Sequence, residues 1–222
     1  MNFSQELLPI PWLLAGFIAY GALLGWAWSG IDRGRLRQEP QRQHLLFAGS
    51  IAVMVLWLTD SGASPGLRVH LLGMTALTLL IGWRQALIGS LFPLVGAVLV
   101  GTEPWPTAGL AGLLLAAVPI GVTHLLWRLT ERFLPHSLVG YLTVCALLGA
   151  AIAAALGRLA ISGLLATTGL YSVASIGQQY LALLPLALLQ ESLVNIVVVA
   201  AVAAWRPKWL MTLPQQRRYL SR

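Results

Sequence analysis

Charged side chains are what this sequence has least of. Asp, Glu, Lys and Arg make up 9% of its 222 residues, whereas soluble domains contain about 25%. This composition excludes an ordinary soluble domain, because a surface in water needs many more charges. The sequence also has one cysteine, Cys145, so it forms no intrachain disulfide and gives no information on the redox compartment.

Several catalytic motifs are absent as well. There is no P-loop, so the chain does not hydrolyse ATP as P-loop proteins do. There is no CxxC pair, no HExxH metalloprotease motif and no Gly-x-Ser-x-Gly nucleophile elbow. We therefore expect no enzyme, and catalysis that uses Glu191 as an acid or base is the least supported function.

Long apolar runs fill most of the chain, and hydrophobic residues account for 58% of it. One helical crossing of a bilayer needs about 20 apolar residues. The runs are continuous rather than alternating, which favours helices over a β-barrel. We predict an all-α, polytopic transmembrane bundle of about seven helices, with six as the alternative count, forming one integral membrane domain over residues 1–222.

The predicted segments are roughly 8–29, 44–58, 69–83, 86–101, 108–127, 138–156 and 180–204. Residues 159–178 contain three glycines and several hydroxyls, and we expect an external loop with a short helix or re-entrant segment there. An interfacial aromatic belt is expected from tryptophans near the segment ends: Trp12, Trp57, Trp83, Trp105, Trp127 and Trp205.

Basic residues are segregated to one predicted side of the membrane. Of the 14 Lys and Arg residues, only Arg68 and Arg158 fall on the other side. Cytoplasmic loops carry the excess of positive charge in membrane proteins. We therefore predict a protein of the bacterial inner membrane with an external N-terminus and a cytoplasmic C-terminus. Residues 205–222 are predicted to form a basic cytoplasmic tail. Because these residues lie at segment ends and not on one amphipathic face, they indicate contact with membrane lipid and no nucleic acid.

Glu191 is the strongest single candidate for function. It lies near the middle of the last segment, where an ionisable side chain is costly to keep. Asn195 lies four residues on and shares its helix face, and Gln190 is adjacent. Two interpretations are open: an interhelical hydrogen bond from a protonated Glu191, or a metal-coordinating or proton-handling carboxylate lining a cavity with Gln190 and Asn195.

A second candidate site lies at the outer side. His70 begins the third segment, Met74 follows on the same face, and Asp60 ends the preceding segment across a short turn. Imidazole, carboxylate and thioether together suit a borderline divalent metal such as nickel, cobalt or copper, carried as substrate. Caps, interfacial groups and packing are the alternative roles for these residues, and no further cofactor is implied. His124, far from His70 in depth, is expected to serve packing or partner contact.

Small residues are concentrated in the sixth segment. Two roles are open for them, close helix packing inside the bundle or a docking face for another membrane subunit. The residues concerned are Gly149, Ala150, Ala153 and Ala154.

Two short motifs resemble the CbiM/NikM type of energy-coupling-factor transporter permease. They are Val69-His70-Leu71-Leu72-Gly73-Met74-Thr75 and Gln190-Glu191-Ser192-Leu193-Val194-Asn195. A little-characterised proteobacterial branch of that family also has segments similar to Arg206-Pro207-Lys208-Trp209 and Arg218-Tyr219-Leu220.

The resemblance implies capture of cobalt or nickel from outside, with a transmembrane coupling subunit and two cytoplasmic ATPases. His70 matches the family's histidine ligand in the His-Leu-x-Gly motif. The family's other main ligands are the terminal amine and a histidine directly after the initiator Met, where this sequence has Asn2. Asp60, Met74 or Glu191 would then replace the missing ligand.

The leading hypothesis is thus a permease or substrate-capture subunit for a divalent metal ion, energised by separate ATPases. His70 and Asp60 would bind the ion at the outer face, and Glu191 would line or close the cavity. The alternative is a non-catalytic structural or assembly subunit of a larger metalloprotein complex.

Overall fold

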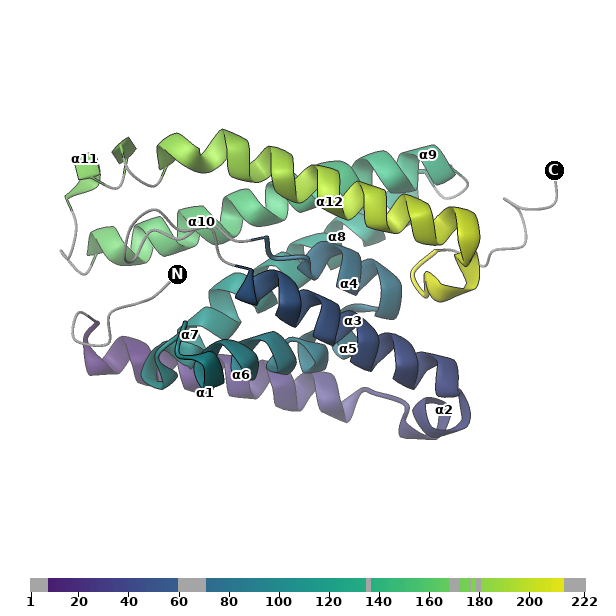
Figure 1. The fold of residues 1–222 in the computed structure, drawn as a ribbon, viewed down its shortest axis with the longest axis horizontal. Helices are drawn as coiled ribbons and strands as arrows, with labels where there is room; N and C mark the ends of the chain where they lie inside the picture. Colours follow the sequence, from purple (N-terminus) through teal and green to yellow (C-terminus); the bar gives the residue numbers. More distant parts are fainter. Residues whose placement is uncertain are drawn as a thin grey trace.

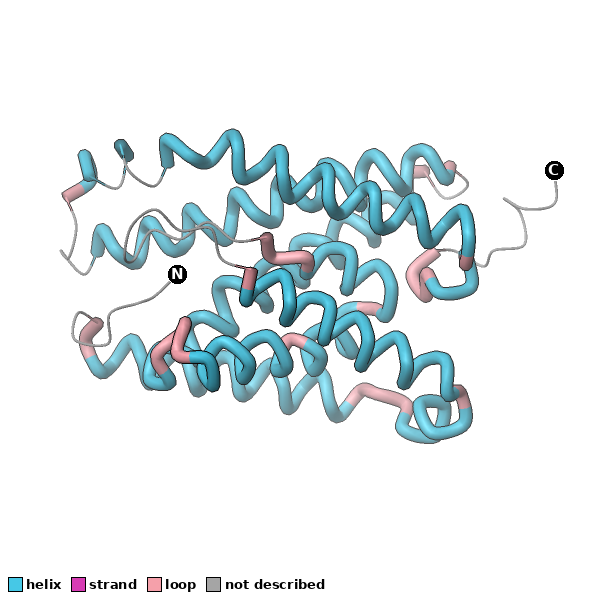
Figure 2. The backbone as a smooth tube through the Cα atoms, viewed as in Figure 1, coloured by secondary structure: helices cyan, strands magenta, loops and turns pink. Residues whose placement is uncertain are grey.

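Helices joined by short loops make up the described part of the chain (Figure 2). The computed structural model describes residues 8–59, 71–134, 137–167, 172–175, 177–178 and 181–213. No strand occurs within these ranges, which confirms the predicted all-α class.

The N-terminal half contains α1 (Ile10–Ser29), α2 (Arg33–Gln38), α3 (Pro40–Leu58), α4 (Met74–Ile81), α5 (Trp83–Gly89) and α6 (Leu91–Val100). The second half begins with the 3₁₀ turn η1 (Trp105–Thr107), α7 (Ala108–Ala111), the π-helical stretch η2 (Gly112–Ala117) and α8 (Val118–Phe133). It continues with α9 (Leu138–Gly140), the π-helical η3 (Tyr141–Leu148), α10 (Gly149–Thr167) and α11 (Val173–Ser175). It ends with η5 (Leu181–Leu183), α12 (Leu184–Trp205) and η6 (Pro207–Trp209).

Within the described residues, five continuous helical stretches are long and apolar enough to cross a membrane. They are Ile10–Ser29, Trp83–Val100, Trp105–Phe133, Leu138–Thr167 and Leu181–Trp205. The chain is therefore a multi-pass membrane protein, as predicted.

Two of the seven predicted segments differ from a full apolar span. α3 has 19 residues but its first turns are polar, and α4 has only eight, which gives a length of about 12 Å. The chain passes through the bundle an odd number of times, because α1 begins at one end of the bundle and α12 ends at the other (Figure 1). Which end faces the cytoplasm stays a prediction.

The prediction of a loop from residue 159 onward is wrong for its first part, since α10 runs to Thr167. Arg158 therefore lies inside this helix and is buried, not in an external loop. The hydroxyl of Ser162 donates to the Arg158 carbonyl at 2.9 Å. A hydroxyl bonded back to residue i−4 is compatible with a helix, which explains why hydroxyl-bearing residues did not end it. The expected short helix is α11.

The basic elements meet at one end of the bundle, where α2, the start of α3 and the ends of α8 and α12 lie together (Figure 1). Asp32 caps α2 by accepting a hydrogen bond from the Arg35 amide at 3.0 Å. Pro40 begins α3, a position where its missing N–H costs nothing. This grouping agrees with the segregation of charge in the sequence.

Glycines allow α1 to approach α7 and η2 closely. A Cβ atom at Gly109 would lie 2.5 Å from the backbone nitrogen of Phe17, and one at Gly112 would lie 2.5 Å from the Tyr20 ring. Small residues let membrane helices pack at such distances. No pattern in the sequence singled out these glycines.

The small residues of the sixth predicted segment are buried in the structure. They lie within the chain's own bundle, where α10 packs against α8 and α12: Gly149, Ala150, Ala153 and Ala154. Their burial corresponds to internal packing, one of the two roles considered. A docking face formed by them is not available in the described bundle.

The chain after α12 folds back onto the basic end of the bundle. The Met211 amide donates to the Leu80 carbonyl at 2.9 Å, and the Thr212 hydroxyl donates to the Leu79 carbonyl at 2.6 Å. The first part of the predicted tail is therefore packed against the end of α4. Residues 214–222 lie outside the described part of the chain.

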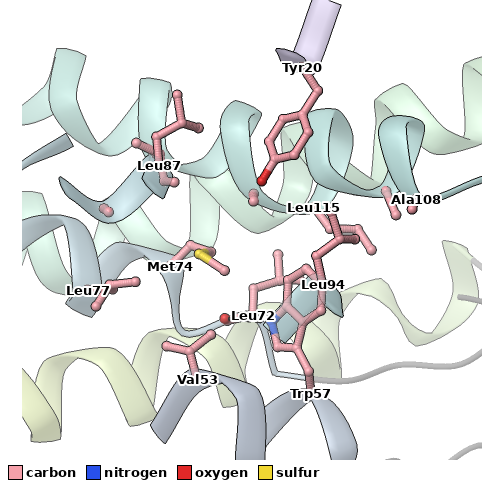
Figure 3. Close-up of a cluster of buried hydrophobic side chains, with 14 of the residues drawn as sticks. Tyr20, Val53, Trp57, Leu72, Met74, Leu77, Leu87, Leu94, Ala108 and Leu115 are labelled. Atoms are coloured by element: carbon pink, nitrogen blue, oxygen red, sulfur yellow. Dashed lines mark hydrogen bonds between the residues drawn. The ribbon is translucent and has the colours of Figure 1, made fainter. Parts of the chain in front are cut away.

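The apolar core surrounds α4. Figure 3 shows Met74 and Leu77 of α4 facing Leu87, with Tyr20 reaching in from α1 and Trp57 from α3. Large apolar side chains on the outer faces of α1, α6 and α12 are exposed, as lipid contact requires.

Candidate functional site

α4 begins inside the bundle, part-way between its two ends (Figures 1 and 2). Residues 71–73 before it are not helical, and Gly73 has a positive φ of 64°, a conformation that glycine adopts without strain. All residues from Met74 to Leu79 are buried. The first N–H groups of a helix have no partner within it, so a helix that starts in the interior needs acceptors from elsewhere.

Glu191 of α12 supplies acceptors for the two residues directly before α4. Its Oε2 accepts the Leu72 amide at 2.8 Å, and its Oε1 accepts the Gly73 amide at 2.8 Å. The side chain is 2% exposed. Hydrogen bonds between a carboxylate and backbone N–H groups are among the stronger ones in proteins. Glu191 thus fixes the backbone turn that leads into α4.

Asn195, one turn further along α12, completes the arrangement. Its Oδ1 accepts the Ala76 amide at 2.7 Å. Its Nδ2 donates to Glu191 Oε1 at 2.9 Å and to the Glu191 carbonyl at 2.7 Å. Asn195 therefore holds the Glu191 side chain in place and also caps α4 directly.

Residues from α3 and α8 complete the contacts of this segment. The Trp57 indole N–H donates to the Leu72 carbonyl at 3.0 Å, and the hydroxyls of Thr75 and Thr123 are 3.0 Å apart. The expectation that Trp57 belongs to an interfacial belt is wrong, because its side chain is buried and bonded to this loop. No pattern in the sequence pointed to the pair of threonines.

α4 is therefore held at both ends by segments far away in the chain. α12 supplies acceptors for two N–H groups of the turn before it and for one in its first turn. Residues 211–212 supply donors for the carbonyls of Leu79 and Leu80 near its end. The result is a rigid half-helix whose leading turn follows directly after His70 in the chain. We name the group formed by Glu191, Asn195 and the Leu72, Gly73 and Ala76 amides the α4 clamp.

The structure brings together only part of the predicted site. Glu191 and Asn195 belong to the α4 clamp, whereas Gln190 is exposed, because neighbouring helical residues point in different directions. Met74 is fully buried in the apolar core. Asp60 and His70 lie outside the described residues. Within the described ranges, no three His, Cys, Asp or Glu side chains are grouped so that they would hold a metal ion.

His124 contributes to packing in the structure. Its ring centroid lies 5.6 Å from that of Trp83 and 5.4 Å from that of Trp127. It is part of an aromatic stack near the basic end, and this agrees with the packing role expected from its depth.

Glu103 is a second buried carboxyl, in the turn between α6 and η1. Its Oε1 lies 2.6 Å from the Thr107 hydroxyl, which is also 2.7 Å from the Pro104 carbonyl. Burial raises the pKa of Glu103 from its ordinary 4.5 to about 7, and the Thr107 contact opposes this only in part. Among the described residues, no backbone N–H group donates to this carboxyl, in contrast to Glu191. Fewer hydrogen bonds therefore replace the water that Glu103 loses on burial.

A comparison with protein families decides the identity of the bundle. The model of the CbiM family, described as the cobalt uptake substrate-specific transmembrane region, matches residues 2–209. The chain belongs to the CbiM family. The resemblance drawn from the two motifs is confirmed, and the chain is a transmembrane component of a cobalt-type metal uptake system in the bacterial cell membrane. No curated protein and no solved structure gives a significant match.

Proposed function

We propose that this CbiM-family chain is the substrate-capture subunit of a cobalt- or nickel-type uptake system, energised by separate ATPase subunits. The observation that carries the proposal is the α4 clamp. It anchors the backbone of Leu72 and Gly73, two and three residues after the histidine of the His-Leu-x-Gly motif. A ligand on a fixed backbone loses less conformational entropy when it binds an ion.

In this proposal the α4 clamp positions ligands and does not coordinate the ion. Glu191 has both oxygens engaged by N–H donors, so coordination would break hydrogen bonds that hold α4. Met74 is surrounded by apolar side chains (Figure 3) and is not required as a ligand. His70 and Asp60 stay as the proposed ligands of the transported ion.

Energy for transport is proposed to come from partner subunits. The sequence has no P-loop, and the family is described as the substrate-specific transmembrane region of an uptake system. We therefore propose a transmembrane coupling subunit and cytoplasmic ATPases as partners. The basic end of the bundle is the side on which the ATPases are expected, because positive charge marks the cytoplasmic face.

Metal binding by the purified chain tests the proposal. Isothermal titration with Co²⁺ and Ni²⁺ is expected to show one site per chain, which His70→Ala abolishes. Glu191→Gln replaces one acceptor oxygen by a donor, so it is expected to weaken binding at least tenfold. Gln190→Ala, the adjacent exposed position, is the matched control and should change affinity less than twofold.

Two outcomes would contradict the proposal. One is unmutated protein that binds neither ion, which together with co-purification in a larger complex would favour the assembly-subunit alternative. The other is a His70→Ala variant that binds as tightly as the unmutated chain.

Asn2→His restores the imidazole that the family carries at this position and is expected to tighten binding at least tenfold.

A further inference from the structure

A cavity of about 250 Å³ opens at the basic end of the bundle, between the end of α1, α2, the start of α3 and the turn from α4 to α5. Three arginines line it, Arg35, Arg42 and Arg84. Asp32 is the one acidic residue among the described residues of its wall. The basic-end pocket therefore has an excess of positive charge.

Two buried polar atoms of residues that line this pocket have no hydrogen-bond partner among the described residues. They are Nε of Arg84 and Oε1 of Gln85. Buried polar groups are nearly always paired, because an unpaired one loses its hydration without replacement. Because both atoms are buried, they can reach a molecule in the cavity only when the Arg84 and Gln85 side chains turn toward it, and that turn would give each of them a partner.

The arginines are held in place while most of their donors stay free. Arg84 donates through Nη1 to the Gly30 carbonyl, and its guanidinium lies 5.1 Å from the centre of the Trp83 ring. Arg42 pairs with Glu39 and contacts the sulfur of Met211 at 3.5 Å. A guanidinium has five N–H donors in a rigid fork, so each retains donors for an anion.

Arg35 is the most accessible of the three. Its Nε lies 3.4 Å from Oδ2 of Asp32, and both side chains are more than half exposed. An exposed pair of this kind contributes little to stability. Arg35 is therefore able to exchange this partner for a stronger one.

The pocket lies beside tryptophans that suit the headgroup region of a membrane. Trp26 and Trp28 near the end of α1 are exposed, and the Trp26 ring lies 4.7 Å from that of Trp83. Arg33 lies over the Trp28 ring at 5.4 Å. Tryptophan is enriched at membrane–water interfaces, so the pocket is at the depth of lipid phosphates.

We propose that the basic-end pocket binds the headgroup of an anionic phospholipid. The phosphodiester oxygens accept hydrogen bonds from Arg84, Arg42 and Arg35, and a headgroup hydroxyl donates to Gln85. The acyl chains lie along the exposed apolar face of α1. Basic pockets between transmembrane helices are a known way to recognise such lipids.

Native mass spectrometry of the full chain, delipidated in detergent, tests this directly. Phosphatidylglycerol is expected to bind at least tenfold more tightly than phosphatidylcholine. The double variant Arg42→Gln/Arg84→Gln is expected to lose at least tenfold in affinity for phosphatidylglycerol. Arg37→Gln removes a charge from α2 outside the pocket and should change affinity less than twofold.

Because the double variant removes partly buried groups, Arg35→Glu provides a second test at an exposed position. It is expected to weaken phosphatidylglycerol binding at least threefold while the chain stays folded. Equal binding of the two lipids, or unchanged binding by both variants, would overturn the proposal. So would displacement of the lipid by millimolar inorganic phosphate or by an acidic peptide, because the site would then belong to a free anion or a partner protein.

Discussion

The α4 clamp and the basic-end pocket are both polar, but they differ in how completely their hydrogen bonds are made. In the α4 clamp, both Glu191 oxygens and both polar atoms of the Asn195 side chain have partners within the chain. Among residues that line the basic-end pocket, Arg84 Nε and Gln85 Oε1 have no partner within the described ranges. A closed set of hydrogen bonds fixes a backbone, whereas an open set leaves binding capacity for another molecule.

Removing the carboxylate of the α4 clamp should give the largest effect on stability. Glu191→Ala leaves the Leu72 and Gly73 amides buried without acceptors, at about 1–3 kcal/mol each, so we expect a loss of about 2–6 kcal/mol. Thermal unfolding in detergent measures it. The counterpart in the open site, Gln85→Ala, breaks no hydrogen bond of the buried Oε1 and should cost less than about 1 kcal/mol. Equal losses for the two variants would remove the distinction between the sites.

Glu103 sharpens the comparison, because it is a buried carboxyl without the N–H donors that Glu191 has. Its pKa of about 7 lies above the ordinary 4.5, so the folded chain keeps a proton that the unfolded chain releases between these values. The stabilisation is complete below pH 4.5 and is lost as the pH rises through about 7, by up to roughly 3 kcal/mol.

Thermal unfolding between pH 4.5 and 8 checks this. The Glu103→Gln variant is expected to lose this part of the pH dependence, whereas Glu39→Gln, at a half-exposed position, should keep it. A pH profile of Glu103→Gln identical to that of the unmutated chain would show that Glu103 does not titrate in this range.

A glycine in each region allows a smaller test. Gly73→Ala forces a Cβ atom into a positive-φ conformation and within 3.1 Å of the Leu56 side chain, so we expect a loss of about 1–2 kcal/mol. A Cβ at Gly30 would meet the guanidinium of Arg84, which would have to give up its hydrogen bond to the Gly30 carbonyl. Gly30→Ala should therefore cost about 0.5–1.5 kcal/mol of stability, measured in the same way.

Much of the fold was predictable because hydropathy reports burial in lipid directly. The helices α1, α8 and α12 follow from continuous apolar runs. The start of α4 could not be predicted, because Leu71 and Leu72 are as apolar as helix residues. The non-helical turn over residues 71–73 is held by hydrogen bonds to a residue more than 110 positions away. Periodicity along α12 did carry a signal, since Glu191, Asn195 and Val199 recur every four residues and all are buried.

Two sequence features led to wrong predictions for the same physical reason. Hydroxyl-bearing residues and a glycine in residues 159–167 indicated a loop, yet the Ser162 hydroxyl donates to a carbonyl of its own helix. Trp57 near a segment end indicated an interfacial position, yet its N–H is used inside the bundle. In both cases the partner of a polar group decides its place, and the sequence alone does not name that partner.

Amide hydrogen exchange at Leu72 and Gly73 tests the α4 clamp most directly. In the unmutated chain in detergent, we predict that both amides exchange as slowly as the core of α8. In Glu191→Gln, where a donor replaces one acceptor oxygen, at least one of them should exchange tenfold faster while α8 is unchanged. Fast exchange of both amides in the unmutated chain, or equal rates in the two proteins, would contradict the account.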